Sequence, residues 1–169
     1  TTLFRSSRCS RSGRSRWASS GAAAAASVAG SPYSITIANA TGAGGFIASN
    51  YNITYTSGNL TVNPANLTIT ANNTSTQYGL GTNLTAVGYS TNGLVNNETI
   101  GSVALTSNGS VATANVANYT ITAANASNNS ASGFNTSNYN ISYVNGTLAV
   151  TQANLTVVAN DQARTYGAA

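Results

Sequence analysis

An internal repeat with a period of 88 residues constrains this chain more than any other feature. Residues 49–71 contain the motifs SNYNITY, GNLTV and ANLTITA, and residues 137–159 contain SNYNISY, GTLAV and ANLTVVA at the same spacings. The register continues to the Tyr-Gly pairs at 78–79 and 166–167. A fixed period of this kind indicates a tandem array, in which each period is one structural unit. We therefore expect the chain to be part of a longer array.

The period divides the chain into segments. Residues 65–152 form a complete repeat, residues 27–64 the C-terminal half of a preceding repeat, and residues 153–169 the N-terminal strands of a following one. Residues 1–26 are a low-complexity Arg/Ser/Ala segment without a starting Met. A signal peptide, a disordered basic arm that binds polyanions, and an aberrant, out-of-frame stretch compete as explanations. The out-of-frame explanation fits best, because the period requires strands of the preceding repeat at the positions where this Arg/Ser/Ala sequence stands.

Alternation of apolar and polar residues predicts the fold class. In the run 139–143 the large side chains fall on every second residue, which is the signature of a half-buried strand. Similar runs give about seven strands per repeat, separated by Gly and Asn turns and without a helical period. A unit of this length can form its own core. The sequence therefore predicts an all-β chain of tandem immunoglobulin-like β-sandwiches.

Two dipeptides are predicted to be hairpin turns. Asn145-Gly146 separates two alternating runs, and its residues tolerate the positive φ angles of a type I′ turn. The resulting register pairs Tyr143 with Leu148 and places the large side chains on one face. Ser57-Gly58 gives the same register in the earlier copy.

All charged residues except Glu98 lie near the ends of the chain. Five of the six Lys+Arg residues lie in the first 16 residues, and the only acids are Glu98 and Asp161. The repeats therefore lack the basic surface that binds nucleic acid. The single Cys9 excludes an intrachain disulfide, and no apolar run is long enough to be a transmembrane segment. The polar character of the repeats comes from Asn, Ser and Thr and not from charge, which fits an exported protein.

The residue inventory argues against an enzyme. The chain has no His and no Lys, so a Ser-His-Asp triad or a Lys nucleophile cannot form. Glu98 and Asp161 are 63 positions apart in different repeats, which argues against paired carboxylates and a calcium site. We expect no catalytic residue, no metal site and no cofactor, and we expect Glu98 to be a solvated loop residue.

One longer motif carries a family resemblance. The pattern N-Y-x-I-x-Y-x-x-G-x-L-x-V, followed by A-x-L-T-x-x-A and a Tyr-Gly pair, resembles the MBG (mostly beta, glycine-rich) domains of large bacterial surface proteins, including filamentous-haemagglutinin-like adhesins. The resemblance covers residues 27–169, although Gln152 stands where the earlier copy has Pro64. It implies an extracellular or cell-surface location and a non-enzymatic stalk or spacer that contacts neighbouring repeats. An adhesive module for glycans or another cell-surface protein, using exposed tyrosines such as Tyr89, is the alternative.

Asn-x-Ser/Thr triplets occur sixteen times, against about six or seven expected from the composition. They are candidate glycosylation sites, notably Asn52, Asn66, Asn140 and Asn154. Strands that alternate outward Asn and Thr with inward apolar residues produce the same triplets.

We expect strand alternation rather than glycan attachment to explain the triplets. The intact mass of the protein from its native host should then equal the sequence mass, which is 17.0 kDa for this chain. A mass increased by whole sugar units would show that the sites are used.

Overall fold

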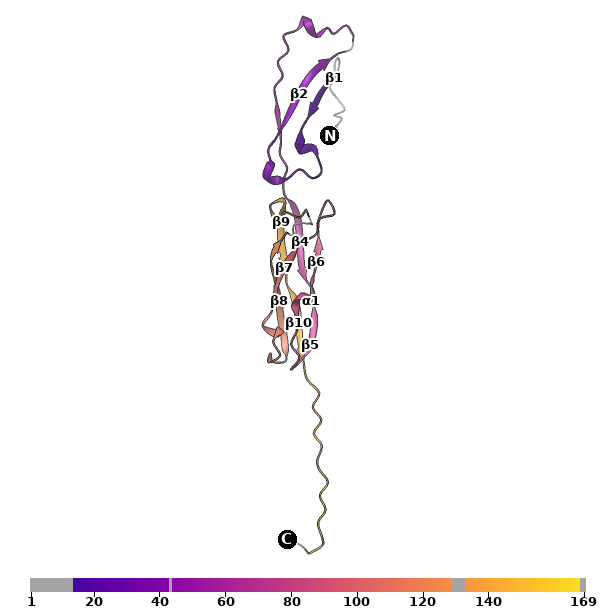
Figure 1. Ribbon diagram of the computed structural model, residues 1–169, viewed down its shortest axis with the longest axis vertical. Helices are drawn as coiled ribbons and strands as arrows, with labels where there is room; N and C mark the ends of the chain where they lie inside the picture. Colours follow the sequence, from indigo (N-terminus) through magenta and orange to yellow (C-terminus); the bar gives the residue numbers. More distant parts are fainter. Residues whose placement is uncertain (1–13, 43, 129–132, 168–169) are drawn as a thin grey trace.

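The computed structural model describes residues 14–42, 44–128 and 133–167. These residues form an elongated molecule of three parts (Figure 1). A three-stranded sheet, the N-terminal sheet, lies at one end; a body of two sheets occupies the middle; and residues 153–167, the C-terminal segment, extend from the other end. Short 3-10 helices lie at Ser20–Ala22, Val28–Gly30, Ala48–Asn50, Asn108–Ser110 and Thr136–Asn138.

The prediction of an all-β chain is confirmed. The N-terminal sheet has the order β1-β2-β3, with β1 at Arg14–Ala18, β2 at Tyr33–Thr41 and β3 at Gly58–Leu60. The body consists of one sheet of order β5-β10-β8-β7 and one of order β6-β4-β9. Its strands are β4 (Ala65–Ala71), β5 (Thr74–Gln77), β6 (Tyr89–Asn92), β7 (Ser102–Thr106), β8 (Ala117–Ser127), β9 (Tyr139–Val144) and β10 (Gly146–Thr151).

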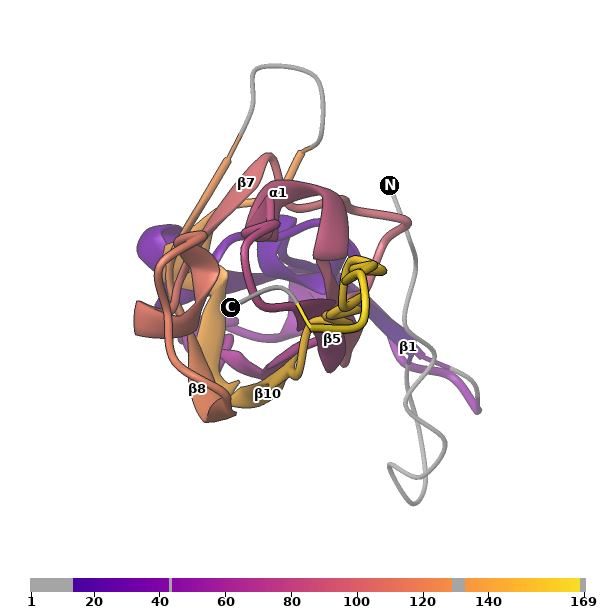
Figure 2. The ribbon, with the colours of Figure 1, turned by 90° about the horizontal axis from the view of Figure 1, so that it is seen from below.

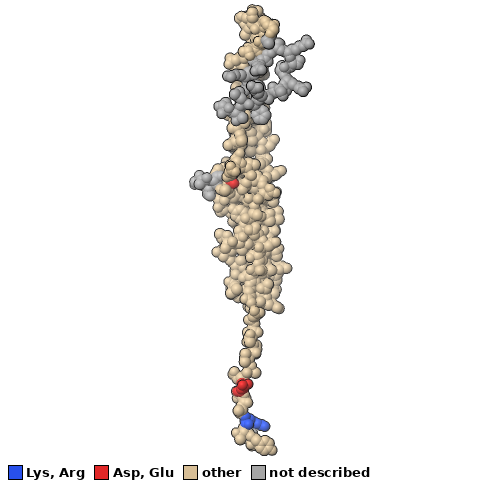
Figure 3. All heavy atoms as spheres, turned by 90° about the vertical axis from the view of Figure 1, so that its right-hand side faces the viewer, with Lys and Arg blue, Asp and Glu red and all other residues tan. Residues whose placement is uncertain are grey.

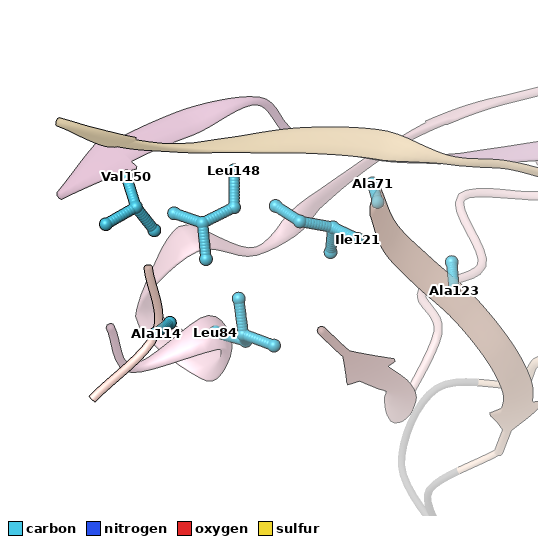
Figure 4. Packing of buried hydrophobic residues seen from close by; sticks show 7 residues of the cluster. All are labelled: Ala71, Leu84, Ala114, Ile121, Ala123, Leu148 and Val150. Atoms are coloured by element: carbon cyan, nitrogen blue, oxygen red, sulfur yellow. The ribbon is translucent and has the colours of Figure 1, made fainter. Parts of the chain in front are cut away.

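The core of the body lies between its two sheets. Along β4, Leu67, Ile69 and Ala71 are buried while the residues between them are more exposed, as the alternation predicts. They meet buried side chains of β8, β9 and β10, and Figure 4 shows one of the two resulting clusters around Ile121 and Leu148. Burying each large aliphatic side chain contributes about 1.5–3 kcal/mol. The view from below shows β5, β10 and β8 of one sheet side by side (Figure 2).

Two extended runs cross from one sheet to the other. The first run is β4 followed by β5, and the second is β9 followed by β10. β4 pairs in parallel with β9, with Ala65 opposite Tyr139 and Thr70 opposite Val144. After both runs cross, β5 pairs in parallel with β10. Thus the first and last runs of the body lie side by side in both sheets.

This topology corrects the predicted hairpin at Asn145-Gly146. β9 and β10 belong to different sheets, and neither Asn145 nor Gly146 has a positive φ. Glycine is needed at 146 for another reason: a Cβ there would lie 2.6 Å from the carbonyl oxygen of Ala71. Tyr143 does not face Leu148 but accepts a hydrogen bond from the Ala126 N–H through its hydroxyl oxygen (2.8 Å).

The prediction of a hairpin at Ser57-Gly58 is also wrong. Residues 52–57 form no strand, and Gly58 begins β3, which pairs with β2. Unlike β9, the run 51–56 has no β4-like strand beside it among the described residues. Without such a partner its backbone groups have no ladder to join.

The N-terminal sheet has the same pairings as β7, β8 and β10 of the body. Trp17 is opposite Ile37 as Leu105 is opposite Ala123, at offsets of 88 and 86 residues. The four residue pairs of β1 with β2 and the three of β2 with β3 all follow these offsets. Within residues 1–26, Arg14–Ala18 therefore forms a strand and is not disordered. That the segment is aberrant stays a prediction, and residues 1–13, with Cys9, lie outside the described part.

The body contains one short helix, although the sequence shows no helical period. Leu84–Val87 forms α1, and the next strand begins only at Tyr89. The Asn83 side chain accepts the Thr85 N–H (3.1 Å), and Gly88 ends the helix at a φ of 72°. This turn buries Leu84 in the core.

The two equivalent glycines should respond differently to alanine. Gly146→Ala forces a methyl group against backbone oxygens, whereas at Gly58 the nearest atoms to such a Cβ are 3.9 Å away. We expect Gly146→Ala to lower the free energy of unfolding by about 1–3 kcal/mol and Gly58→Ala to leave it unchanged or slightly raised. Urea denaturation of both variants measures this. Equal losses at the two sites would contradict the crossing topology and favour two hairpins.

Candidate functional site at the joint between the N-terminal sheet and the body

The joint between the N-terminal sheet and the body is the candidate site. It contains a cavity of about 200 Å³. Its lining includes Ala24, Val28 and Val62 from the N-terminal side and Glu98, Asn138 and Tyr139 from the body. Glu98 is the only charged residue between Trp17 and Gln152. The space-filling view shows how little charge one face of the molecule carries (Figure 3).

Glu98 is held by a tight turn. Asn96 and Asn97 both have positive φ angles (55° and 56°), which Asn tolerates better than most residues. The Glu98 N–H donates to the Val95 carbonyl (3.0 Å), and the turn brings the carboxylate to Tyr139. The Tyr139 hydroxyl donates to Glu98 Oε2 at 2.8 Å and accepts the Val95 N–H at 3.2 Å. Glu98 is therefore a half-buried hydrogen-bond acceptor and not the solvated loop residue expected from the sequence.

Two asparagines connect the body to the N-terminal part. The Asn138 Oδ1 accepts the Val28 N–H at 2.9 Å, and the Asn96 amide donates to the Ala24 carbonyl at 3.3 Å. Asn138 ends the 3-10 helix Thr136–Asn138, whose start is capped by Asn135, and this places Asn138 directly before β9. Both bonds cross the joint, so they resist rotation of one part against the other.

Burial raises the pKa of Tyr139 above the usual value of about 10. The hydrogen bond from the Val95 N–H lowers this pKa, while the hydrogen bond to Glu98 and its negative charge raise it. The phenol is therefore neutral, and able to donate to Glu98, at neutral pH. The ring packs against Phe134, with centroids 5.3 Å apart.

The arrangement suits orientation rather than reaction. A neutral phenol, one carboxylate and amides can hold two surfaces together, but they include no activated nucleophile. No group of three or more His, Cys, Asp or Glu side chains lies together in the described residues. Within the same residues, no helix has the length and hydropathy to cross a membrane.

The candidate glycosylation sites do not line the joint cavity and are exposed. Asn66 in β4 and Asn140 in β9 are direct partners on neighbouring strands, so the structure brings these two together. Asn52 and Asn154 are exposed in non-strand segments. Glycan attachment at these sites remains a prediction. Tyr89, proposed as an exposed loop tyrosine, is instead a half-buried residue of β6 that packs on the core.

Sequence reasoning missed Asn96 and Asn138 as joint residues. Their chemical type carries no signal in a chain with 24 asparagines. Glu98 did carry such a signal, because the single carboxylate of an otherwise uncharged repeat points to a hydrogen-bond donor beside it. Tyr139 was expected in the core, and its ring is buried there.

We expect alkaline pH to weaken the body through Tyr139. Its folded-state pKa is raised, so its contribution to stability is fully present below about pH 10 and declines as the pH rises through the folded-state pKa. Tyr139→Phe removes this dependence and costs about 1–3 kcal/mol at neutral pH, because the Val95 N–H and Glu98 lose a partner. Urea denaturation between pH 8 and 11 measures both effects. Tyr166→Phe, at a fully exposed ring, is the control; an unchanged pH profile in Tyr139→Phe would contradict this role.

Comparison with known families gave one match. Residues 67–149 match the family described as MBG domain (YGX type). The matched range begins in β4 and ends in β10, and it contains Glu98, Asn138 and Tyr139. Comparison with curated proteins and with solved structures gave no match. MBG domains occur as repeat modules of surface proteins. Residues 67–149 of this chain therefore belong to the MBG domain family, YGX type.

Proposed function

We propose that the chain is part of a tandem array of immunoglobulin-like β-sandwich units of about 88 residues, which serves as a non-enzymatic stalk or spacer in a secreted or cell-surface bacterial adhesin-type protein. The observation that carries this proposal is the shared strand register of the N-terminal sheet and of β7, β8 and β10. Arg14–Ala18 differs in sequence from β7, yet it pairs with β2 as β7 pairs with β8. This is expected of consecutive copies of one structural unit.

Shared side-chain contacts extend the equivalence. The Tyr55 hydroxyl oxygen accepts the Ala40 N–H at 2.8 Å, as that of Tyr143 accepts the Ala126 N–H at 2.8 Å. Phe46 stacks on Tyr51 at 5.1 Å, as Phe134 packs on Tyr139. These contacts involve structural residues, so the repeated feature is the fold and not a reactive group.

The joint supports a spacer. The chain passes from β3 to β4 through a short link that ends in Asn63-Pro64, and Asn138 and Asn96 hold the two parts together. A short link with cross-bonds favours a fixed angle between units over free rotation. Units in a line with fixed joints hold distant parts of a protein apart.

Removing one joint bond should loosen the spacer. Asn138→Ala deletes the acceptor for the Val28 N–H, while Asn140→Ala changes an exposed asparagine two residues away. We expect Asn138→Ala to broaden the distribution of interatomic distances in small-angle X-ray scattering of dilute protein. Asn140→Ala should match the wild type. Identical profiles for Asn138→Ala and wild type would show that this bond does not set the angle.

A pure spacer should bind no external ligand. We expect no saturable binding of the chain to an array of glycans and extracellular-matrix proteins. Reproducible, saturable binding that is lost on heat denaturation would contradict the spacer function and favour the adhesive module.

A further inference from the structure

We propose that the body resists mechanical tension: when force acts along the chain, its first run (β4 and β5) and second run (β9 and β10) form a clamp that opposes extension. This inference rests on the proposed function and deepens it, because a spacer that holds two parts of a protein apart transmits the force between them. All strands of the clamp lie within the complete repeat of residues 65–152. The clamp therefore needs no strand from a neighbouring repeat.

Tension enters and leaves the body at opposite ends. The chain enters β4 from the joint and leaves β10 at the far end (Figure 1). β4 and β9 lie near the joint, and β5 and β10 lie near the far end, so both runs extend along the long axis (Figure 1). A pull at residues 64 and 152 therefore acts along the strands and draws the first run and the second run in opposite directions.

The two strands that receive the force are interior strands. β4 lies between β6 and β9, and β10 lies between β5 and β8. Each strand is thus hydrogen-bonded on both sides, and neither is an edge strand that a pull could peel from its sheet. Movement of β4 or β10 along its own axis has to break the bonds to two neighbours together.

The two runs are also bonded directly to each other. β4 and β9 form six parallel residue pairs, and β5 and β10 form four. Because both ladders lie along the direction of the pull, they are loaded in shear, and their hydrogen bonds share the force. The evenly spaced bonds of a parallel ladder suit such sharing. A pull across the ladder would instead break its bonds one after another.

Side-chain hydrogen bonds strengthen the contact between the runs. Asn73 Oδ1 accepts the Thr147 N–H at 2.8 Å where the runs cross, and the Thr151 hydroxyl donates to the Thr76 carbonyl at 3.2 Å beyond the crossing. The two runs contain no charged residue. Salt therefore does not screen the interactions of the clamp.

Sliding of the runs would also open the core. Leu67 and Ile69 of β4 are 1% and 0% exposed, and Leu148 and Val150 of β10 are 0% and 4% exposed. Because strand side chains alternate between two faces, a slide by one residue moves these side chains from the core face to the solvent face. Extension thus has to break hydrogen bonds and expose the core in the same step.

Pulling the same body in two directions tests the proposal. In a Cys9→Ser background of the full chain, pairs of exposed residues are replaced by cysteine to attach handles for single-molecule force measurement. Asn63→Cys with Ala153→Cys applies the force along the strands. Asn63→Cys with Ser137→Cys draws apart the adjacent starts of β4 and β9, so it peels the same ladder from one end. Urea denaturation shows that both double variants are folded.

We expect unfolding by the axial pull to need at least about twofold more force than unfolding by the peeling pull at the same pulling speed, because the ladder bonds share the load only in the axial pull. Equal forces in the two directions, or a larger force for peeling, would overturn the proposal.

A side-chain bond between the runs gives a second test. Asn73→Ala deletes the acceptor for the Thr147 N–H. The control is Asn72→Ala, which deletes a hydrogen bond to the Val87 carbonyl (3.1 Å) that does not join the two runs. We expect Asn73→Ala to lower the axial unfolding force more than Asn72→Ala does. An equal or smaller loss in Asn73→Ala would contradict a clamp between the runs.

The spacer function can fail or hold independently of the clamp. Equal forces in the two directions would leave the results of ligand binding and X-ray scattering unchanged, so the chain would still be a spacer. Saturable ligand binding would contradict the pure spacer without altering the ratio of the two forces.

Discussion

The parallel pairing of β4 with β9 is the interaction on which the rest of the structure depends. It joins Ala65–Ala71 to Tyr139–Val144, so it closes the body between its first and last strand runs. The chain itself contains the comparison that shows this dependence. Residues 51–56 and 153–159 closely repeat the β9 and β4 sequences, yet they form no strand where the partner is missing. Strand formation here is therefore decided by pairing and not by local propensity alone.

The same pairing sets the position of the second sheet and of the joint. Beyond Ala71 and Val144 both runs cross over, and the Asn73 side chain accepts the Thr147 N–H at 2.8 Å at the crossing. Gly146 permits the close approach of the two backbones there. At the other end of the pair, the start of β9 places Asn138 and Tyr139 at the joint, where they meet Val28 and Glu98. One strand pair thus connects core, crossing and joint.

Much of the fold could be predicted from the sequence because burial follows alternation. The predicted strand at Leu67, Ile69 and Ala71 is β4, and about seven strands were expected where the structure describes seven. The prediction of a hairpin at Asn145-Gly146 was wrong. A glycine that is needed for close approach of two backbones looks the same in the sequence as a glycine in a turn. The strand Arg14–Ala18 was not predicted, because its Arg/Ser composition hides a strand register that only pairing with β2 reveals. The joint residues Asn96 and Asn138 could not be predicted, since contacts between units leave no periodic pattern.

Amide hydrogen exchange on dilute protein tests the central claim most directly, because it compares nearly identical sequences in different pairing states within one molecule. If pairing between β4 and β9 decides strand formation, amides of Asn140–Val144 should be strongly protected, while those of Asn52–Thr56 and residues 154–159 exchange at nearly unprotected rates. Similar protection in the paired and unpaired copies would contradict the account, because it would show that these segments hold their structure without the partner strand.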